Sequence, residues 1–187
     1  MFITLAVVVA TSVAAGFALN LPLRVAPSAD QRAVETAFRG AITAELQVQS
    51  TAVEPPGRPF TAAELPAQHD LDADHLSAFT TGPLFERALS IADSAHLGQV
   101  TRGRAWQDAG VTSVDFNAVS VQGDHATVDA TAEAWFNFNG QGIPPGNSRS
   151  GADGHNGVTY HADVIRTLGN HWKVSNYAWH FLPGEGP

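Results

Sequence analysis

The stretch that decides the fold is residues 158–181, VTYHADVIRTLGNHWKVSNYAWHF. Apolar and polar residues alternate on both sides of Gly169-Asn170, a pair typical of two-residue hairpin turns because both residues tolerate positive φ. The stretch therefore predicts two antiparallel strands, at about 158–168 and 171–181. If Leu168 lies opposite His171, the remaining pairs are Thr159 with His180, His161 with Ala178, Asp163 with Asn176, Ile165 with Val174 and Thr167 with Trp172.

This register gives the two faces of the hairpin different characters. One face is aromatic and aliphatic, with Tyr160, Tyr177 and Trp179 at its centre. The other face collects polar side chains and also carries Trp172 near the turn. A slip of one residue in the turn would exchange the two faces, so the assignment depends on the turn geometry. The predicted polar cluster comprises Thr159, His161, Asp163, Asn176 and His180.

A second pair of strands is predicted upstream, at 112–121 and 125–138, joined by a tight turn at Gln122-Gly123-Asp124. Small apolar residues alternate with polar residues in the later strand. This pattern is typical of a sheet with one face covered, and small side chains allow a helix to approach closely. The residues between the two hairpins, 139–157, are rich in Gly, Asn and Ser and predict a long loop.

Helical spacing dominates the residues before these strands. Ser28 and Gln31 form a capping-box pattern that predicts a helix from about 29 to 48. Thr61 and Glu64 offer a second capping box, and a further helical region spans about 72–97, interrupted near Thr81-Gly82-Pro83. Helices followed by antiparallel strands predict an α+β fold, with N-terminal helices packed on a curved antiparallel sheet of about four to six strands. The predicted core residues of the first helix are Ala33, Val34, Ala37, Phe38, Ala41, Ile42 and Leu46.

Composition excludes several functions. The chain has 187 residues, no cysteine and a formal net charge of -8. A net negative charge disfavours nucleic acid and anionic membrane surfaces as partners, because both require a basic face. The absence of cysteine excludes disulfides, thiol nucleophiles and cysteine-ligated metals. We expect no cofactor.

The N-terminus, MFITLAVVVATSVAAGFALNLPLRV, carries no charge from residue 2 to residue 19. Residues 1–23 are therefore predicted to be a membrane anchor or a signal peptide, followed by a short linker at 24–27. Residues 2–23 contact the membrane if this segment is not cleaved. Either interpretation places the following domain outside the cytoplasm, membrane-anchored or secreted, with a tail at 183–187.

The order of elements resembles the nuclear-transport-factor-2-like superfamily, also called SnoaL-like. The resemblance rests on VQGDHATVDATAEAWF, TYHADVIRTLGNHWKVSNYAW and the helix RAVETAFRGAI, and covers about residues 28–182. An apolar segment before such a domain is similar to the layout of actinobacterial Mce-associated and conjugation-channel accessory proteins. The resemblance implies a cone-shaped, cystatin-like roll with a pocket inside the sheet. Members include hydrolases, dehydratases and isomerases as well as proteins that only bind or assemble, so the fold alone does not give the function.

Two functions from different classes remain open. The first is a non-catalytic domain that binds a small apolar ligand or serves as an accessory subunit of a cell-envelope assembly, either alone or as a homodimer. The second is a SnoaL-like hydrolase, dehydratase or isomerase in which His161 and Asp163 perform general acid–base catalysis. Thr159, Asn176, His180 and Trp172 are the candidate ligand-binding residues. No metal site is predicted, because GADGHNG lacks the ligand spacing of a calcium loop and the chain has no HExxH motif.

Overall fold

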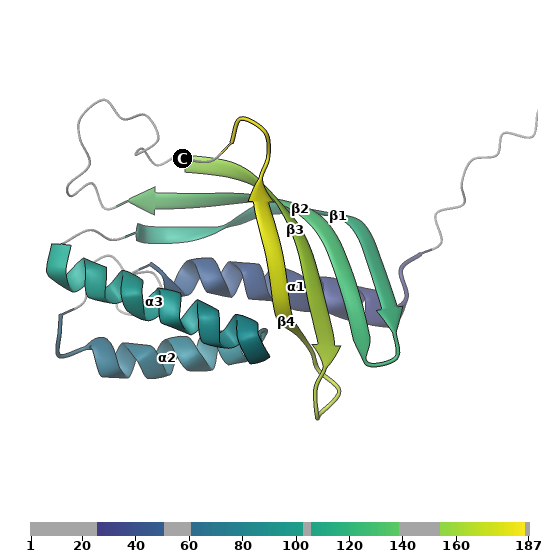
Figure 1. The fold of residues 1–187 in the computed structure, drawn as a ribbon, viewed down its shortest axis with the longest axis horizontal. Coiled ribbons are helices and arrows are strands. Elements are labelled where there is room, and N and C mark those ends of the chain that lie inside the picture. Colours follow the sequence, from purple (N-terminus) through teal and green to yellow (C-terminus); the bar gives the residue numbers. More distant parts are fainter. Residues whose placement is uncertain (1–25, 51–60, 103–105, 139–153, 186–187) are drawn as a thin grey trace, which may run out of the picture.

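A computed structural model describes residues 26–50, 61–102, 106–138 and 154–185. In these residues three helices precede four strands (Figure 1). The sheet is antiparallel, its strand order follows the sequence, and the helices cover one of its faces. The predicted α+β fold, with N-terminal helices on an antiparallel sheet, is confirmed. The elements are α1 (Ala29–Val48), α2 (Leu65–Ser77), α3 (Gly82–Arg102), β1 (Trp106–Gln122), β2 (His125–Phe138), β3 (Gly154–Arg166) and β4 (Trp172–Phe181).

The predicted capping box at the start of α1 is present. The Gln31 backbone N–H donates to the Ser28 hydroxyl, and the Ser28 N–H donates to the Gln31 side-chain carbonyl. These bonds satisfy donors that have no partner within the helix, so the helix begins where the sequence predicts. The predicted core stripe is correct except that Ala33 is exposed and Leu46 is only half-buried. The buried residues of α1 are Val34, Ala37, Phe38, Ala41, Ile42, Ala44 and Val48.

The helix-covered face of the sheet holds the main core. Phe38 is fully buried and packs edge-on against Phe116 of β1 and Tyr160 of β3, with ring centroids 6.0 and 5.5 Å apart. Tyr160 in turn packs edge-on against Tyr177 of β4 at 5.4 Å. Such contacts add about 0.5–1.5 kcal/mol each beyond the buried area. The small side chains predicted to lie under a helix do so; Ala126, Ala130 and Ala132 belong to this core.

The β3–β4 hairpin confirms half of the predicted register and corrects the other half. Asp163 lies opposite Asn176 as predicted, but an irregularity follows, so that Val164 rather than Ile165 lies opposite Val174. The turn is also longer than two residues, because β3 ends at Arg166 and β4 begins at Trp172. Gly169 and Asn170 do take positive φ, and the Asn170 N–H donates to the Thr167 carbonyl. The extra residue moves Trp172 from the predicted polar face to the core.

Strand lengths differ from the predictions at two places. β1 begins at Trp106, six residues before the predicted start, and β3 begins at Gly154, within the predicted loop. Glycine-rich residues next to a strand can pair even when their composition is typical of a loop. The predicted anchor or signal peptide, residues 1–23, lies outside the described residues. Among the helices of the described residues, none is long and apolar enough to cross a membrane.

Gly40 offers a test of the packing between α1 and Phe79, in the segment between α2 and α3. A Cβ atom placed on Gly40 would lie 2.2 Å from a ring atom of Phe79. Gly40→Ala should therefore destabilise the fold by about 1–3 kcal/mol through overpacking, although alanine is the better helix former. Chemical denaturation monitored by circular dichroism measures this change.

Gly98→Ala in α3 is the matched control. The nearest atom to an added Cβ there is the end of the flexible Arg102 side chain, at 3.3 Å. The control should therefore be stabilising by up to about 1 kcal/mol. Equal stabilisation by both substitutions would contradict the observed contact between α1 and Phe79.

Candidate functional site

The predicted polar cluster lies on the face of the sheet that the helices leave uncovered, which we call the outer face. Thr159 lies opposite His180, His161 opposite Ala178 and Asp163 opposite Asn176, all as predicted. His161, Asp163, Asn176 and His180 are exposed and Thr159 is half-buried. Trp172 is not part of this group, because its side chain is buried in the helix-side core with Arg166 over its ring. The structure thus brings together five of the six predicted residues on an open surface.

His161 is paired with a residue that the sequence pattern did not single out. Its Nδ1 atom lies 2.6 Å from a carboxylate oxygen of Asp129, which is directly across on β2. Both side chains are open to solvent, 62% exposed for His161 and 51% for Asp129. The hydrogen bond to Asp129, followed by the negative charges of Asp129 and Asp163, raises the pKa of His161. An exposed pair of this kind is screened by water and salt, so its contribution to stability is small.

The neighbouring polar side chains bond mainly to strand backbone. The Thr159 hydroxyl donates to the His180 carbonyl, and the Ser175 hydroxyl donates to the Asp163 carbonyl. These bonds use the hydroxyl protons within the β3–β4 hairpin. The Asp163 carboxylate faces solvent beside His161, but the hydrogen-bond partner of His161 is Asp129.

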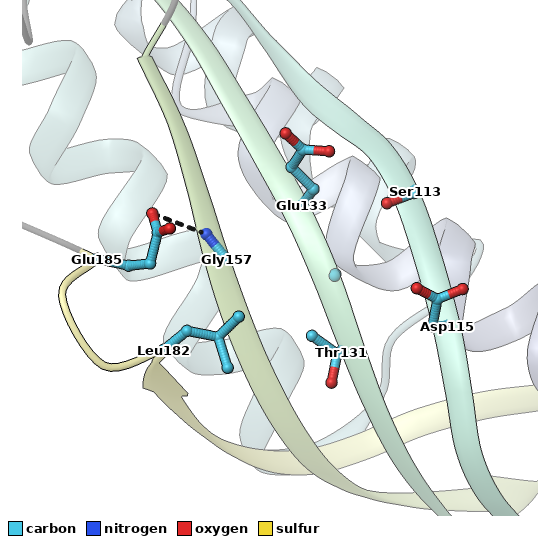
Figure 2. A pocket seen from close by; sticks show the side chains of 8 residues that line it. Ser113, Asp115, Thr131, Glu133, Gly157, Leu182 and Glu185 are labelled. Carbon is cyan, nitrogen blue, oxygen red and sulfur yellow. Dashed lines mark hydrogen bonds between the residues drawn. The ribbon is translucent and has the colours of Figure 1, made fainter.

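A hollow of about 330 Å³ lies on the outer face (Figure 2). One of its lining residues, Thr131, lies opposite Thr159, which is two residues from His161 on β3. β1 and β2 form its floor, and the segment that follows β4 forms one wall. The Leu182 N–H donates to the Gly157 carbonyl, and a Glu185 carboxylate oxygen accepts from the Gly157 N–H at 3.4 Å. A Cβ on residue 157 would lie 2.5 Å from a terminal methyl carbon of Leu182, so any other residue at 157 would have to displace the Leu182 side chain. The lining residues are Ser113, Asp115, Thr131, Ala132, Glu133, Gly157, Leu182 and Glu185.

This hollow is open and carries three carboxylates, from Asp115, Glu133 and Glu185. None of the residues predicted for the site lines it. Its chemistry favours a cationic or hydrogen-bond-donating group over an apolar ligand. The alternation of β1 and β2 places Asp115 and Glu133 on the exposed face, but the wall formed by residues 182–185 depends on the path of the chain after β4.

A second titratable group lies on the covered side of the sheet. Glu45 follows Phe38 by seven residues and Ala41 by four, so it lies on the core-facing stripe of α1, where it is half-buried. Burial raises its pKa to about 7, against a smaller opposing effect of the Arg87 charge. Burial also raises the pKa of Tyr160, with a further contribution from Glu45. Arg87 stacks over the Tyr177 ring and donates to the Tyr177 carbonyl.

A third group is a buried polar network between α2 and α3. His96 Nε2 lies 2.8 Å from one carboxylate oxygen of Asp72, and the Gln68 amide donates to the other at 2.7 Å. The side chains of His96 and Asp72 are 2% and 0% exposed, which closes them to a substrate. α2 buries Gln68, Asp72 and Leu76, so its attachment to α3 depends largely on this network. We therefore assign the Asp72–His96 pair a structural role.

No group of three or more potential ligand side chains able to hold a metal ion occurs within the described ranges. The titratable pairs Asp129–His161, Asp72–His96 and His69–Asp93 each bring together one carboxylate and one imidazole.

Comparisons with known proteins identify the fold. No protein-family model matches the sequence, and no curated protein matches it. Solved structures do match, among them the crystal structure of the intermembrane space region of the chloroplast protein ARC6. The two chains are 19% identical, the TM-score is 0.51, and the match covers 83% of this chain and 100% of that one. At this identity the likeness shows a shared fold.

The pairing of His161 can be tested by its titration. Asp129→Asn should lower the pKa of His161, because it replaces the charged hydrogen-bond acceptor with a neutral amide and removes the negative charge that affects His161 most. Asp163→Asn, the matched control on the same face, should lower it less. The pH dependence of the imidazole Cε1–H signals in NMR spectra measures both changes, and an equal or larger fall with Asp163→Asn would contradict the assignment.

Glu45 should make the stability depend on pH. Its pKa is about 7 in the folded chain and 4.5 ordinarily, so between these values the folded state binds more protons than the unfolded state. Stability should therefore fall as the pH rises through this window. Glu45→Gln should flatten the fall and, at pH 8, stabilise the protein by about 1–3 kcal/mol.

Denaturation series from pH 4.5 to 8 measure this effect. Glu86→Gln, on the exposed surface of α3, is the matched control for loss of one carboxylate. If Glu45→Gln leaves the slope unchanged, the carboxyl is not buried as described.

Proposed function

We propose that this chain is a non-catalytic, extracytoplasmic domain of the nuclear-transport-factor-2-like type that serves as an accessory subunit of a cell-envelope assembly. The observation that carries the proposal is the position of His161 and Asp163 on the open outer face, where His161 is 62% exposed. General acid–base catalysis works best where water is excluded and the substrate is held against the catalytic groups. An exposed sheet surface favours contact with another macromolecule instead.

The packing of the helix-covered face supports assembly over binding of an apolar ligand inside the cone. Tyr160 contacts both Phe38 and Tyr177 where the resemblance implies a pocket. Their rings occupy space that an apolar ligand would need. The charge-free residues 2–19 support a location outside the cytoplasm, by the argument from anchors and signal peptides.

The test is complementation by a variant that lacks both candidate catalytic side chains. Cells lacking the native gene receive the wild-type chain, His161→Ala with Asp163→Ala, or the matched control Ser120→Ala with Thr127→Ala on the same face. We expect all three chains to restore the envelope phenotype equally. We also expect native electrophoresis to show the wild-type chain in a complex larger than its own oligomers.

Two outcomes would overturn the proposal. If the His161/Asp163 variant folds but fails to complement while its control succeeds, the result would support the alternative function, a SnoaL-like hydrolase, dehydratase or isomerase. If the chain migrates without any other envelope protein under all conditions that preserve complementation, the accessory role is lost.

A further inference from the structure

The two edges of the sheet differ in how they are protected against pairing with another strand. Edge strands usually carry charges, prolines or bulges that prevent such pairing. β1 has three register shifts along its pairing with β2, and Asp115 is exposed on it. These irregularities interrupt the regular spacing of backbone groups that an added strand would need.

β4 lacks this protection beyond Tyr177, whose carbonyl accepts a hydrogen bond from Arg87 of α3. The first half is covered, because Val174 exchanges backbone hydrogen bonds with Phe79 and Thr81. From Asn176 to Phe181 the pairing with β3 is regular, and in the described part of the chain no strand lies on the other side. The four residues from Ala178 to Phe181 correspond to about 13 Å of strand, which is within the usual range of strand lengths.

The side chains of this half-strand are uncharged and largely exposed. Residues 175–182, SNYAWHFL, contain no Asp, Glu, Lys or Arg. Trp179 and Phe181 are 47% and 36% exposed and pack edge-on against each other, with ring centroids 5.0 Å apart. This end of β4 extends beyond the helices (Figure 1). Exposed aromatic surface at an uncharged edge is typical of an interaction site.

We propose that residues 178–181 of β4 pair antiparallel with the same residues of a second copy of this chain. An antiparallel strand is complementary to its own copy about a two-fold axis, so one patch serves both subunits. The chain carries a net charge of -8, and this uncharged edge allows two copies to meet without bringing carboxylates of either copy directly together. The result is a continuous eight-stranded sheet with the Trp179–Phe181 pairs on its helix side.

The test uses single cysteines, because the natural sequence contains none. Asn176, Ala178, Trp179, His180 and Phe181 are replaced by cysteine one at a time in the full-length chain, purified in detergent and mildly oxidised. The residue on the two-fold axis lies directly opposite its copy, within disulfide distance, while residues two positions away do not. We expect one position to form a disulfide-linked dimer in high yield and Ser120→Cys, on exposed β1, to form none.

A charge at the same edge should break the dimer. Ala178→Asp places like charges close together across the axis and should weaken dimerisation at least tenfold in sedimentation velocity, whereas Ser120→Asp should not change it. Circular dichroism confirms that each variant is folded. A wild-type chain that stays monomeric up to about 100 µM would overturn the proposal, as would a dimer with no cysteine maximum in β4 or with equal sensitivity to both aspartates.

Discussion

The structure depends on Phe38, whose ring is fully buried between α1 and the sheet. Phe38 contacts Phe116 on β1 and Tyr160 on β3, and Tyr160 in turn contacts Tyr177 on β4. One side chain of α1 thus links both edge strands of the sheet through a chain of edge-on rings. Because the strands must curve around α1 to make these contacts, one face of the sheet is closed, and the polar residues of every strand are left on the other.

The sequence was informative wherever structure depends on residues close together along the chain. The capping box at Ser28 and Gln31 fixed the start of α1, and alternation fixed the register of β3 and β4 from Thr159 to Asp163. The error began at the bulge after Asp163. A bulge has no strong sequence signal, yet it moves the residues of β4 between the turn and the bulge to the other face. That single residue explains why Trp172 belongs to the core.

The candidate site was less predictable, because its contacts join distant residues. Asp129 pairs with His161 because the β2–β3 register places the two residues opposite each other. Residues 139–153 separate the two strands, and the length of this segment alone does not specify the register. Glu45, by contrast, could have been found: a carboxylate at helical spacing from Phe38 and Ala41 lies on an apolar stripe, and that is an unusual position. Asp72 and His96 are also polar residues at buried positions, and they lie in α2 and α3, whose apolar stripes are weak.

The acidic outer face and the uncharged edge of β4 can each bind a partner at the same time. A two-fold axis perpendicular to the sheet keeps the outer faces of both copies on the same side, since antiparallel neighbours must have matching side-chain orientation. In the proposed dimer the carboxylates of Asp115, Asp129, Glu133 and Asp163 would therefore form one extended acidic surface, while the helices of both copies lie behind it. Such a surface attracts a basic partner over distances up to about 10 Å at moderate salt. Dimerisation through the uncharged edge would thus enlarge the surface available to an envelope partner without covering any of it.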